Sequence, residues 1–304
     1  MTIAGKKYGK AVIYLFSLTS IALWGMSYIW SDRILSLGIP VEYFLPIRTL
    51  LAGTILFLVN LVMGYNMRIR KDDALIFLLL AFCEPFIYFF CETYGIKLTE
   101  SPTISALVIA TTPIFSVIFA YLFFRERVTW VNIVGILVCL VGLALVTRVE
   151  GGYGPFFIYG LLVLLIAVFA EVGHAACTKK LSDGYKPSVI VMYQFLIGTV
   201  YFLPMFLTRG LENYDPSVYL SIDFIKPLLA LTILCSSLAF SLWAFTIKEL
   251  GVAKSSIFLA MIPLMTAVWG FLLGAERLCA LQWAGLGIAC VGIILSQLCD
   301  RKVE

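Results

Sequence analysis

The sequence predicts an all-α membrane protein with ten transmembrane helices, arranged as two inverted five-helix repeats. Two observations predict this fold: the apolar composition, and a repeat with a period of 150 residues. Of the 304 residues, 62% are hydrophobic and 13% are charged, whereas a soluble domain has about 25% charged residues. One or two soluble cores could not bury so much apolar surface, so we expect the chain to span a membrane.

Ten apolar segments are long enough to cross a bilayer, because a hydrocarbon core about 30 Å thick requires about 20 residues per helix. These predicted spans lie near residues 11–30, 42–63, 74–95, 103–124, 130–147, 157–177, 187–207, 226–247, 254–274 and 282–299. They are too long and too evenly apolar for barrel strands, which alternate over about ten residues. The first run continues to Trp30 without a small-residue cleavage pattern, so we expect a retained span and not a signal peptide.

The repeat relates residues 105–145 to residues 255–295, where 10 of 41 positions are identical without a gap. The identical positions include scarce residue types: Pro113, Glu126, Arg127, Gly135 and Gly142 correspond to Pro263, Glu276, Arg277, Gly285 and Gly292. Internal repeats are typical of transporters whose substrate site lies between two like halves. Because five is an odd number of spans, the second half would enter the membrane from the opposite side. We therefore predict inverted repeats over residues 1–150 and 151–304.

The positions of Lys and Arg favour a cytoplasmic location for both termini. With the N-terminus inside, 15 of the 22 Lys and Arg residues fall at cytoplasmic ends, 6 at the opposite ends and Arg48 within a span. The expected location is the plasma (inner) membrane, in contact with the lipid bilayer. The net charge of +4 follows from this bias, so no nucleic-acid partner is expected.

A set of residues along the whole chain resembles a known family. The set comprises Trp24-Gly25, Arg48, the mid-span Pro113 and Pro263, and Glu126 and Glu276, each followed by a Gly-x6-Gly helix. It resembles the EamA type of the drug/metabolite transporter superfamily. The resemblance implies a carrier of small metabolites, often amino acids or related compounds, usually moving outward. One departure is Glu171, which takes the sixth-span position that corresponds to Trp24.

The repeated residues mostly predict structural roles. Pro113 and Pro263 each free the carbonyl four residues earlier, which is tolerated only against protein or a wet cavity. For both prolines two roles remain equally open: a fixed structural kink, or a position at a hinge or in the substrate site. Glu126 and Glu276 lie near the start of a helix, where a carboxylate stabilises by about 0.3–1 kcal/mol, so we assign them a structural role. The glycine pairs would hold the halves together or support a homodimer, although a monomer already contains two halves.

Ionisable residues within the spans are the sharper candidates, because a charge at bilayer depth costs about 2.5–3.5 kcal/mol. Glu84, Tyr88 and Glu92 are spaced by four residues in the third span and share a helix face. Glu171 and His174 share a face of the sixth span. The substrate-binding candidates are Trp24, Glu84, Tyr88, Glu171, His174 and Trp243.

Two interpretations of these ionisable residues compete. In one, buried carboxyl groups and His174 exchange protons near neutral pH and couple proton movement to substrate. In the other, Arg48 pairs with Glu92 and His174 pairs with Glu171 as structural locks. The resemblance favours the lock for Arg48, since it places an arginine there in carriers of unlike substrates. For Glu84 and Glu171 we favour a role in the cavity.

Catalytic residues, metals and cofactors are not expected. His174 is the only histidine, and the eight cysteines show neither metal-ligand spacing nor a C-x-x-C motif. No Walker loop is present, so the carrier would be a facilitator or ion-coupled. The alternative is an organic-phosphate or nucleotide-sugar carrier, but such anions require several facing cations. An integral membrane enzyme is less favoured, because no paired interfacial carboxylates or histidine cluster are present.

Overall fold

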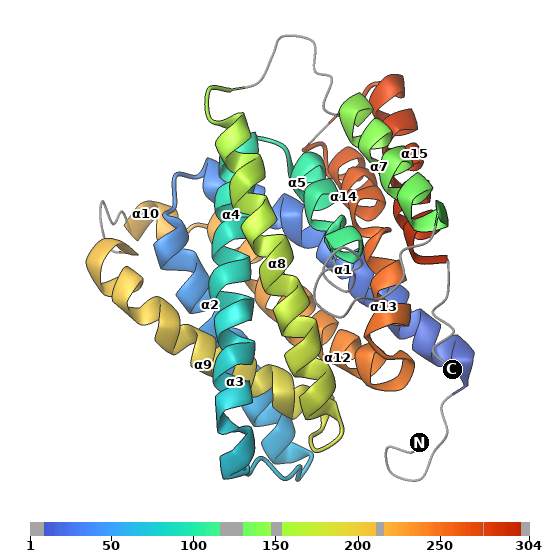
Figure 1. Ribbon diagram of the computed structural model, residues 1–304. Helices are drawn as coiled ribbons and strands as arrows, with labels where there is room; N and C mark the ends of the chain where they lie inside the picture. The colour runs from blue at the N-terminus through green and yellow to red at the C-terminus, as the bar shows by residue number, and fades with distance from the viewer. Residues whose placement is uncertain (1–8, 116–129, 147–153, 211–215, 276, 299–304) are drawn as a thin grey trace.

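The structure is a computed structural model that describes residues 9–115, 130–146, 154–210, 216–275 and 277–298. Within these residues the regular elements are helices (Figure 1). In the first half they are α1 (Lys10–Ser36), α2 (Val41–Val62), η1 (Lys71–Asp73), α3 (Ala74–Ala81), η2 (Phe82–Ile87), α4 (Tyr88–Thr99), α5 (Pro102–Ile109) and α7 (Trp130–Val146). In the second half they are α8 (Phe157–Ser182), α9 (Pro187–Met205), η3 (Phe206–Gly210), α10 (Pro216–Tyr219), α11 (Ile222–Leu229), η4 (Ala230–Leu238), α12 (Ala239–Leu250), α13 (Val252–Leu259), α14 (Ile262–Leu272) and α15 (Ala280–Leu298).

The helices have the length and composition of a multi-pass membrane protein. Six helical stretches of the described chain are long and apolar enough to cross a bilayer: Ala11–Ser36, Val41–Val62, Lys71–Thr99, Phe157–Ser182, Pro187–Gly210 and Ile222–Leu250. Four shorter apolar helices accompany them: Pro102–Phe115, Ile133–Val146, Ile262–Leu272 and Ala280–Leu295. The predicted all-helical membrane fold is therefore confirmed, and each predicted span overlaps one of these helices.

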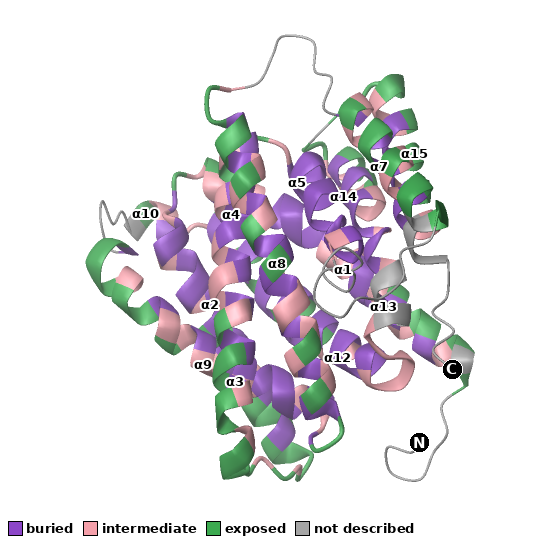
Figure 2. Cartoon of the chain, in the orientation of Figure 1, coloured by how far each residue is buried: buried purple, intermediate pink, exposed green. Residues whose placement is uncertain are grey.

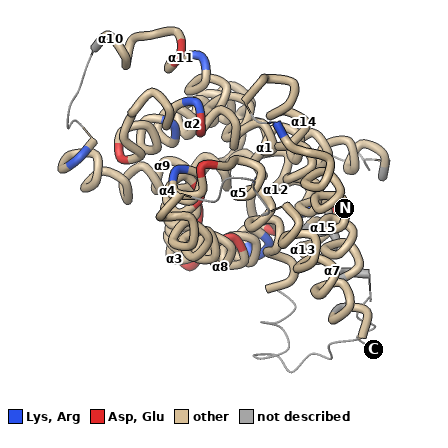
Figure 3. Tube along the Cα trace, turned by 90° about the horizontal axis from the view of Figure 1, so that it is seen from above, with Lys and Arg blue, Asp and Glu red and all other residues tan. Residues whose placement is uncertain are grey.

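The outer faces of the helices carry the apolar side chains that a bilayer would cover. Buried residues concentrate along α5, α14 and the inward faces of the long helices, while exposed residues follow their outer faces (Figure 2). Large exposed apolar side chains include Val62, Leu75, Val141 and Val200. Lys, Arg, Asp and Glu are sparse along the trace (Figure 3). Because exposed apolar surface of this extent is unstable in water, this pattern agrees with a lipid environment.

Helices from the two halves pack against each other in pairs. α2 packs on α9, α4 on α8, and α7 on α15, while α1 contacts both α12 and α14. α7 and α15 lie side by side at one edge of the molecule (Figures 1 and 3). The central space is consequently surrounded by elements from both halves.

Glycines allow the close contact between α7 and α15. A Cβ atom added at Gly142 would collide with the backbone of Ala289, and one added at Gly292 would collide with the backbone of Cys139. A Cβ atom at Gly285 would lie 2.9 Å from the Gly142 carbonyl oxygen. Small residues let helix backbones approach in this way. The prediction that these glycines pack helices together is confirmed within a single chain.

The two repeated prolines follow the same kind of helix break. α5 ends at Ile109 and α13 ends at Leu259, and after a two-residue turn the helix resumes with Pro113 or Pro263 in its first turn. Proline is accepted in a first turn because its missing N–H has no partner to lose there. The Thr112 hydroxyl donates a hydrogen bond of 2.6 Å to the Ile109 carbonyl, which the break would leave free. Both prolines are buried.

Candidate functional site

A central cavity lies between helices of both halves. It has about 450 Å³ of space not occupied by atoms, its open mouth included. Its walls combine aromatic side chains with ionisable ones, as expected for a site that orients a small amphipathic molecule. The lining residues are Trp24, Ser27, Tyr28, Arg48, Glu84, Tyr88, Phe89, Glu92, Ile109, Thr112, Glu171, Phe240, Leu259 and Ile262.

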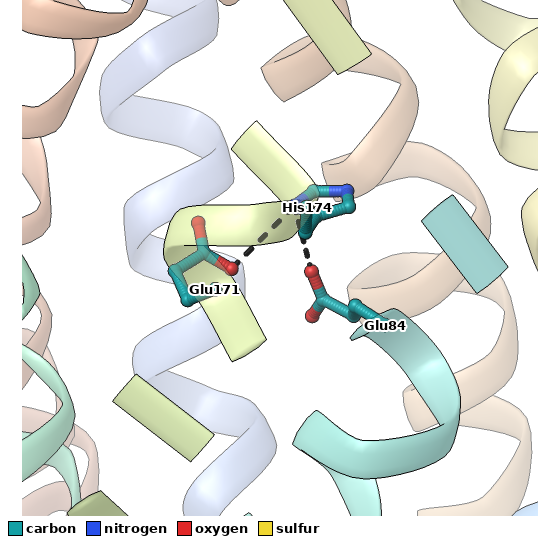
Figure 4. Close-up of side chains that lie close together, drawn as sticks. All are labelled: Glu84, Glu171 and His174. Atoms are coloured by element: carbon teal, nitrogen blue, oxygen red, sulfur yellow. Dashed lines mark ion pairs between the residues drawn. The ribbon is translucent and has the colours of Figure 1, made fainter. Parts of the chain in front are cut away.

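Two carboxylates that line this cavity meet a histidine that is not itself among the lining residues (Figure 4). His174 Nδ1 lies 2.9 Å from Glu84 Oε2 and 3.5 Å from Glu171 Oε2. Its other ring nitrogen, Nε2, is 3.2 Å from the hydroxyl of Thr178. Glu84, Glu171 and His174 are 1%, 7% and 2% exposed, so they interact away from bulk water. The predicted contact between Glu171 and His174 is formed, and Glu84 joins it from another helix.

Local backbone geometry places these side chains. Glu84 lies in the π-helical turn η2 with φ −146° and ψ 124°, values that interrupt the helix before Pro85. The interruption turns Glu84 toward α8, which carries the other two side chains. Glu171 and His174 are three residues apart on α8, so they project from the same face.

The same three side chains also carry atoms of the types that bind metal ions. Within the described residues their ligand atoms lie within 4.8 Å of one another. Bonds of about 2.0–2.1 Å to a tetrahedral metal would hold ligand atoms roughly 3.3 Å apart. Glu84 Oε2 and His174 Nδ1 lie closer than this, at the 2.9 Å distance of an ion pair, and neither atom has a hydrogen-bond partner among the described residues. The three side chains therefore form a buried ionisable cluster whose hydrogen-bonding groups are not fully satisfied.

A second polar chain continues from this cluster along α4. The Tyr88 hydroxyl donates to Glu92 Oε1 at 3.1 Å, and it lies 3.4 Å from the Tyr28 hydroxyl. Glu92 is buried, and all three residues line the cavity. The prediction that Glu84, Tyr88 and Glu92 share one face is thus confirmed.

Arg48 does not make the ion pair expected from the sequence. Its Nε donates a hydrogen bond of 2.8 Å to the Ser236 hydroxyl, and its guanidinium lies 4.2 Å from the centre of the Phe89 ring. No ion pair with Glu92 is formed, although both side chains line the cavity. One terminal nitrogen of Arg48 is buried without a hydrogen-bond partner among the described residues. The arginine therefore keeps unused donor capacity next to the cavity.

The two deep tryptophans occupy neighbouring but different positions. Trp24 lines the central cavity and its indole N–H donates to the Cys235 carbonyl at 3.2 Å. The Trp24 and Trp243 ring centres are 5.2 Å apart. Trp243 lines an adjoining cavity that also contacts Glu171, and its indole nitrogen has no partner in the part of the chain described. This second cavity extends from Glu171 toward Ser255, near the start of α13.

Corresponding positions of the two halves make corresponding contacts. An offset of 147 residues relates Trp24 to Glu171, and an offset of 151 residues relates Glu84 to Cys235. The Trp24 indole donates to the backbone carbonyl of Cys235, while Glu171 and Glu84 both lie close to His174. Both contacts join the first helix of one half to the broken third span of the other. One contact is a hydrogen bond to a backbone carbonyl, and the other brings two carboxylates to a histidine.

The remaining candidates lie elsewhere. Pro113 and Pro263 follow the breaks beside Ile109 and Leu259, which line the cavity. Glu126 and Glu276 lie outside the described residues. Sequence reasoning missed three polar cavity residues, Ser27, Tyr28 and Thr112, and the arginine's partner Ser236. Their signal is weak, because isolated hydroxyls are common in membrane helices and often bond their own backbone.

The fold and the site define a class of protein: a multi-pass helical membrane protein whose ionisable side chains meet in a cavity between its helices. The chain matches the EamA-like transporter family over residues 11–148 and 158–298, and it belongs to this family. It is therefore a membrane transporter and not an enzyme, and it acts on a small-molecule substrate within a lipid bilayer.

Several known proteins are similar along most of the chain. An uncharacterized transporter of Archaeoglobus fulgidus is 25% identical over 91% of this chain and 95% of its own. A probable terminal-alkyne amino-acid exporter of Streptantibioticus cattleyicolor is 32% identical over 66% of each chain. A solved crystal structure superposes with a TM-score of 0.68 over 95% of this chain and 96% of that one, at 18% identity. At that identity the structural match establishes the fold alone.

Proposed function

We propose that this protein is a secondary carrier that exports amino acids or related small metabolites from the cytoplasm. In this proposal ten spans form two inverted repeats, residues 1–150 and 151–304, which alternate the access of the central cavity between the two sides. Both termini face the cytoplasm, and the carrier lies in the plasma membrane. A monomer is sufficient, because it contains both halves.

The packing of the helices supports the inverted repeat. If α1, α2 and α7 correspond to α8, α9 and α15, two of the major contacts, α2 with α9 and α7 with α15, join equivalent elements. The contact of α1 with α12 likewise has its counterpart in the contact of α8 with α4. The helix breaks before Pro113 and Pro263 repeat at a spacing of 150 residues. Such symmetry lets two conformations exchange roles across the membrane.

The observation that carries the proposed mechanism is a pair of buried carboxylates in the cavity wall with a single histidine close to both. These groups can hold one or more protons in common, and the number held affects the charge that faces a substrate. An incoming ammonium group could replace a proton on Glu84 or Glu171, and loss of the substrate could return it. We propose that proton exchange at this cluster is coupled to substrate movement in this way.

Arg48 and the aromatic walls support an amino acid as the substrate class. The unused guanidinium donor of Arg48 could bind a substrate carboxylate, while the carboxylates across the cavity bind its amino group. Trp24, Phe89 and Phe240 would surround an apolar side chain. The relative described as a probable terminal-alkyne amino-acid exporter agrees with this class.

The test is amino-acid flux in proteoliposomes at a series of internal and external pH values. Wild-type protein is expected to move amino acids faster when the proton gradient drives protons in the direction opposite to the amino acid. Glu84→Gln and Glu171→Gln should remove this pH dependence, whereas Glu42→Gln should retain it. Glu42 is a matched control, since it is also buried and hydrogen-bonded, by Tyr94 at 2.6 Å, but does not line the cavity. An unaltered pH dependence in Glu84→Gln would refute the coupling, and no flux of any amino acid would refute the substrate class.

An organic-phosphate or nucleotide-sugar carrier is the alternative substrate class. Such anions bind to clusters of cations. Among the residues that line the cavity, Arg48 is the one cation, against three carboxylates. This charge balance favours an amine-bearing substrate. Flux of a sugar phosphate in the same proteoliposomes, without flux of amino acids, would reverse the assignment.

A further inference from the structure

A separate pocket at one end of the molecule has the chemistry of an anion site. It lies where the α2–η1 connection, the α8–α9 connection and the end of α12 come together, beside the adjoining lower ends of α3 and α8 in Figure 1. The pocket is lined mainly by Arg68, Arg70, Lys186, Lys248 and Asp183. Four cations thus face one carboxylate, and the Lys and Arg bias assigns this end to the cytoplasm.

Three of the four cations lack a carboxylate partner. Arg70 is neutralised by Asp73 at 2.6 Å. Among the described residues, Arg68, Lys186 and Lys248 form no ion pair. Lys186 lies 5.5 Å from the Tyr65 ring centre, and Lys248 donates a hydrogen bond of 3.4 Å to the Tyr185 backbone carbonyl. Lys186 is near enough to Lys248 to act on its charge, and Glu249 and Asp183 act on it in the opposite direction. Four cations around one lining carboxylate leave an excess of positive charge, which favours a bound anion.

The walls of the pocket are held in place by Tyr185. Its hydroxyl donates to Asp73 at 2.8 Å and accepts the Arg70 backbone N–H at 3.0 Å. Its carbonyl accepts the bond from Lys248, and its ring packs against Phe77 at 5.1 Å. One buried tyrosine therefore fixes the positions of three segments, so that the cations are preorganised around the pocket.

The surroundings indicate a lipid as the source of the anion. Helix α2 ends with the exposed apolar Val62 and Met63 just before the pocket, and the exposed Leu75 follows it on α3. Acyl chains could lie along these helix faces while a headgroup reached the cations. Basic pockets of this kind on the cytoplasmic side bind anionic headgroups.

We infer that this pocket binds the phosphodiester headgroup of an anionic phospholipid from the cytoplasmic leaflet. The site is separate from the central cavity and does not depend on the proposed transport function. It joins residues 66–70 of the first half to Lys186 and Lys248 of the second. A lipid bound there would stabilise the conformation in which these segments are together.

The test is thermal unfolding of the full chain, purified in a neutral detergent. Phosphatidylglycerol in mixed micelles is expected to raise the unfolding temperature, whereas equal amounts of phosphatidylcholine or of inorganic phosphate should not. Lys186→Gln should require about fivefold more phosphatidylglycerol for the same rise in unfolding temperature. This factor is the effect expected when one Lys near an anionic surface is lost. Lys186→Gln with Lys248→Gln should require more still.

Lys97→Gln is the matched control, because Lys97 lies at the opposite end and also faces a tyrosine ring, Tyr94, at 5.9 Å. It should respond to phosphatidylglycerol as wild type does. Lys186→Arg, which keeps the charge, should restore the response, and native mass spectrometry should count fewer retained lipids in the double variant. Equal weakening by Lys97→Gln, equal stabilisation by phosphatidylcholine, or a full shift with inorganic phosphate alone would each overturn the inference. None of these outcomes depends on transport.

Discussion

Glu84 illustrates how far a single residue can be interpreted from sequence. The spacing of Glu84, Tyr88 and Glu92 predicts one shared helix face, and the spacing of Glu171 and His174 predicts another. Their convergence was beyond prediction, because a contact between the third and sixth spans depends on how α8 packs against η2. The sequence indicated which side chains are exceptional, while tertiary packing determined that they meet.

Arg48 was assigned the wrong partner for a related reason. A long arginine side chain can reach several helices. Glu92 is the obvious partner from sequence, because it carries the opposite charge. The structure instead supplies Ser236, a residue whose type carries no distinctive signal in a membrane helix. The unused nitrogen of Arg48 then changes its interpretation, from a closed structural lock to a donor available to a substrate.

A comparison of ligands tests this role of Arg48. Wild-type protein should be stabilised against thermal unfolding by phenylalanine, whose carboxylate can reach the guanidinium. In Arg48→Gln the half-saturating phenylalanine concentration should rise by about tenfold or more, since a hydrogen bond to a charged group contributes about 1.5–3 kcal/mol. Phenethylamine, which lacks the carboxylate, should bind both proteins equally.

Arg33→Gln is the control for this comparison, since Arg33 also lies over an aromatic ring, that of Trp30 at 5.0 Å, and donates to the Leu273 carbonyl at 2.8 Å. It lies outside the cavity and should not alter the response to phenylalanine. If Arg48→Gln weakens phenylalanine and phenethylamine alike, the arginine is structural, as the resemblance first implied.

At the scale of helices, the pairing of α7 with α15 depends on the absence of side chains. The sequence predicted that glycines spaced by seven residues in both halves would either hold the halves together or support a homodimer, and the structure shows the contact within one chain. By contrast, the π-helical segment η4 (Ala230–Leu238) had no sequence signal, since no proline lies within it. It packs against α1 and α2, elements distant in the sequence.

Alanine substitutions can measure the α7–α15 contact. Gly142→Ala should lower the free energy of unfolding by about 1–3 kcal/mol, because its Cβ atom would overlap the backbone of Ala289. Gly287→Ala provides the control on α15, since nothing lies within 4 Å of the added carbon. That variant should be neutral or slightly stabilised, because alanine is a better helix former by about 1 kcal/mol. Thermal unfolding in detergent would compare them, and equal stability of both variants would contradict the packing role.

For the whole molecule, the sequence predicted the helical fold and the family, but the orientation in the membrane still rests on the positions of Lys and Arg. The structure groups the connections into two ends. The α8–α9 connection and the α12–α13 connection lie at the basic end, near Lys186 and Lys248. The α14–α15 connection belongs to the other end, which the charge bias places outside the cell.

Cys279 makes this orientation measurable. It is exposed in the α14–α15 connection, whereas the other described cysteines are buried or half-buried. A membrane-impermeant maleimide added to intact cells should therefore label wild-type protein and should fail to label Cys279→Ser. In a Cys279→Ser, Cys299→Ser background, a cysteine introduced at the exposed Asp183 should react only after the membrane is permeabilised. The opposite labelling pattern would reverse the topology and place the basic pocket outside the cell. Asp183 reports on the termini as well, because it follows the sixth of ten proposed spans and therefore lies on the same side as both ends of the chain.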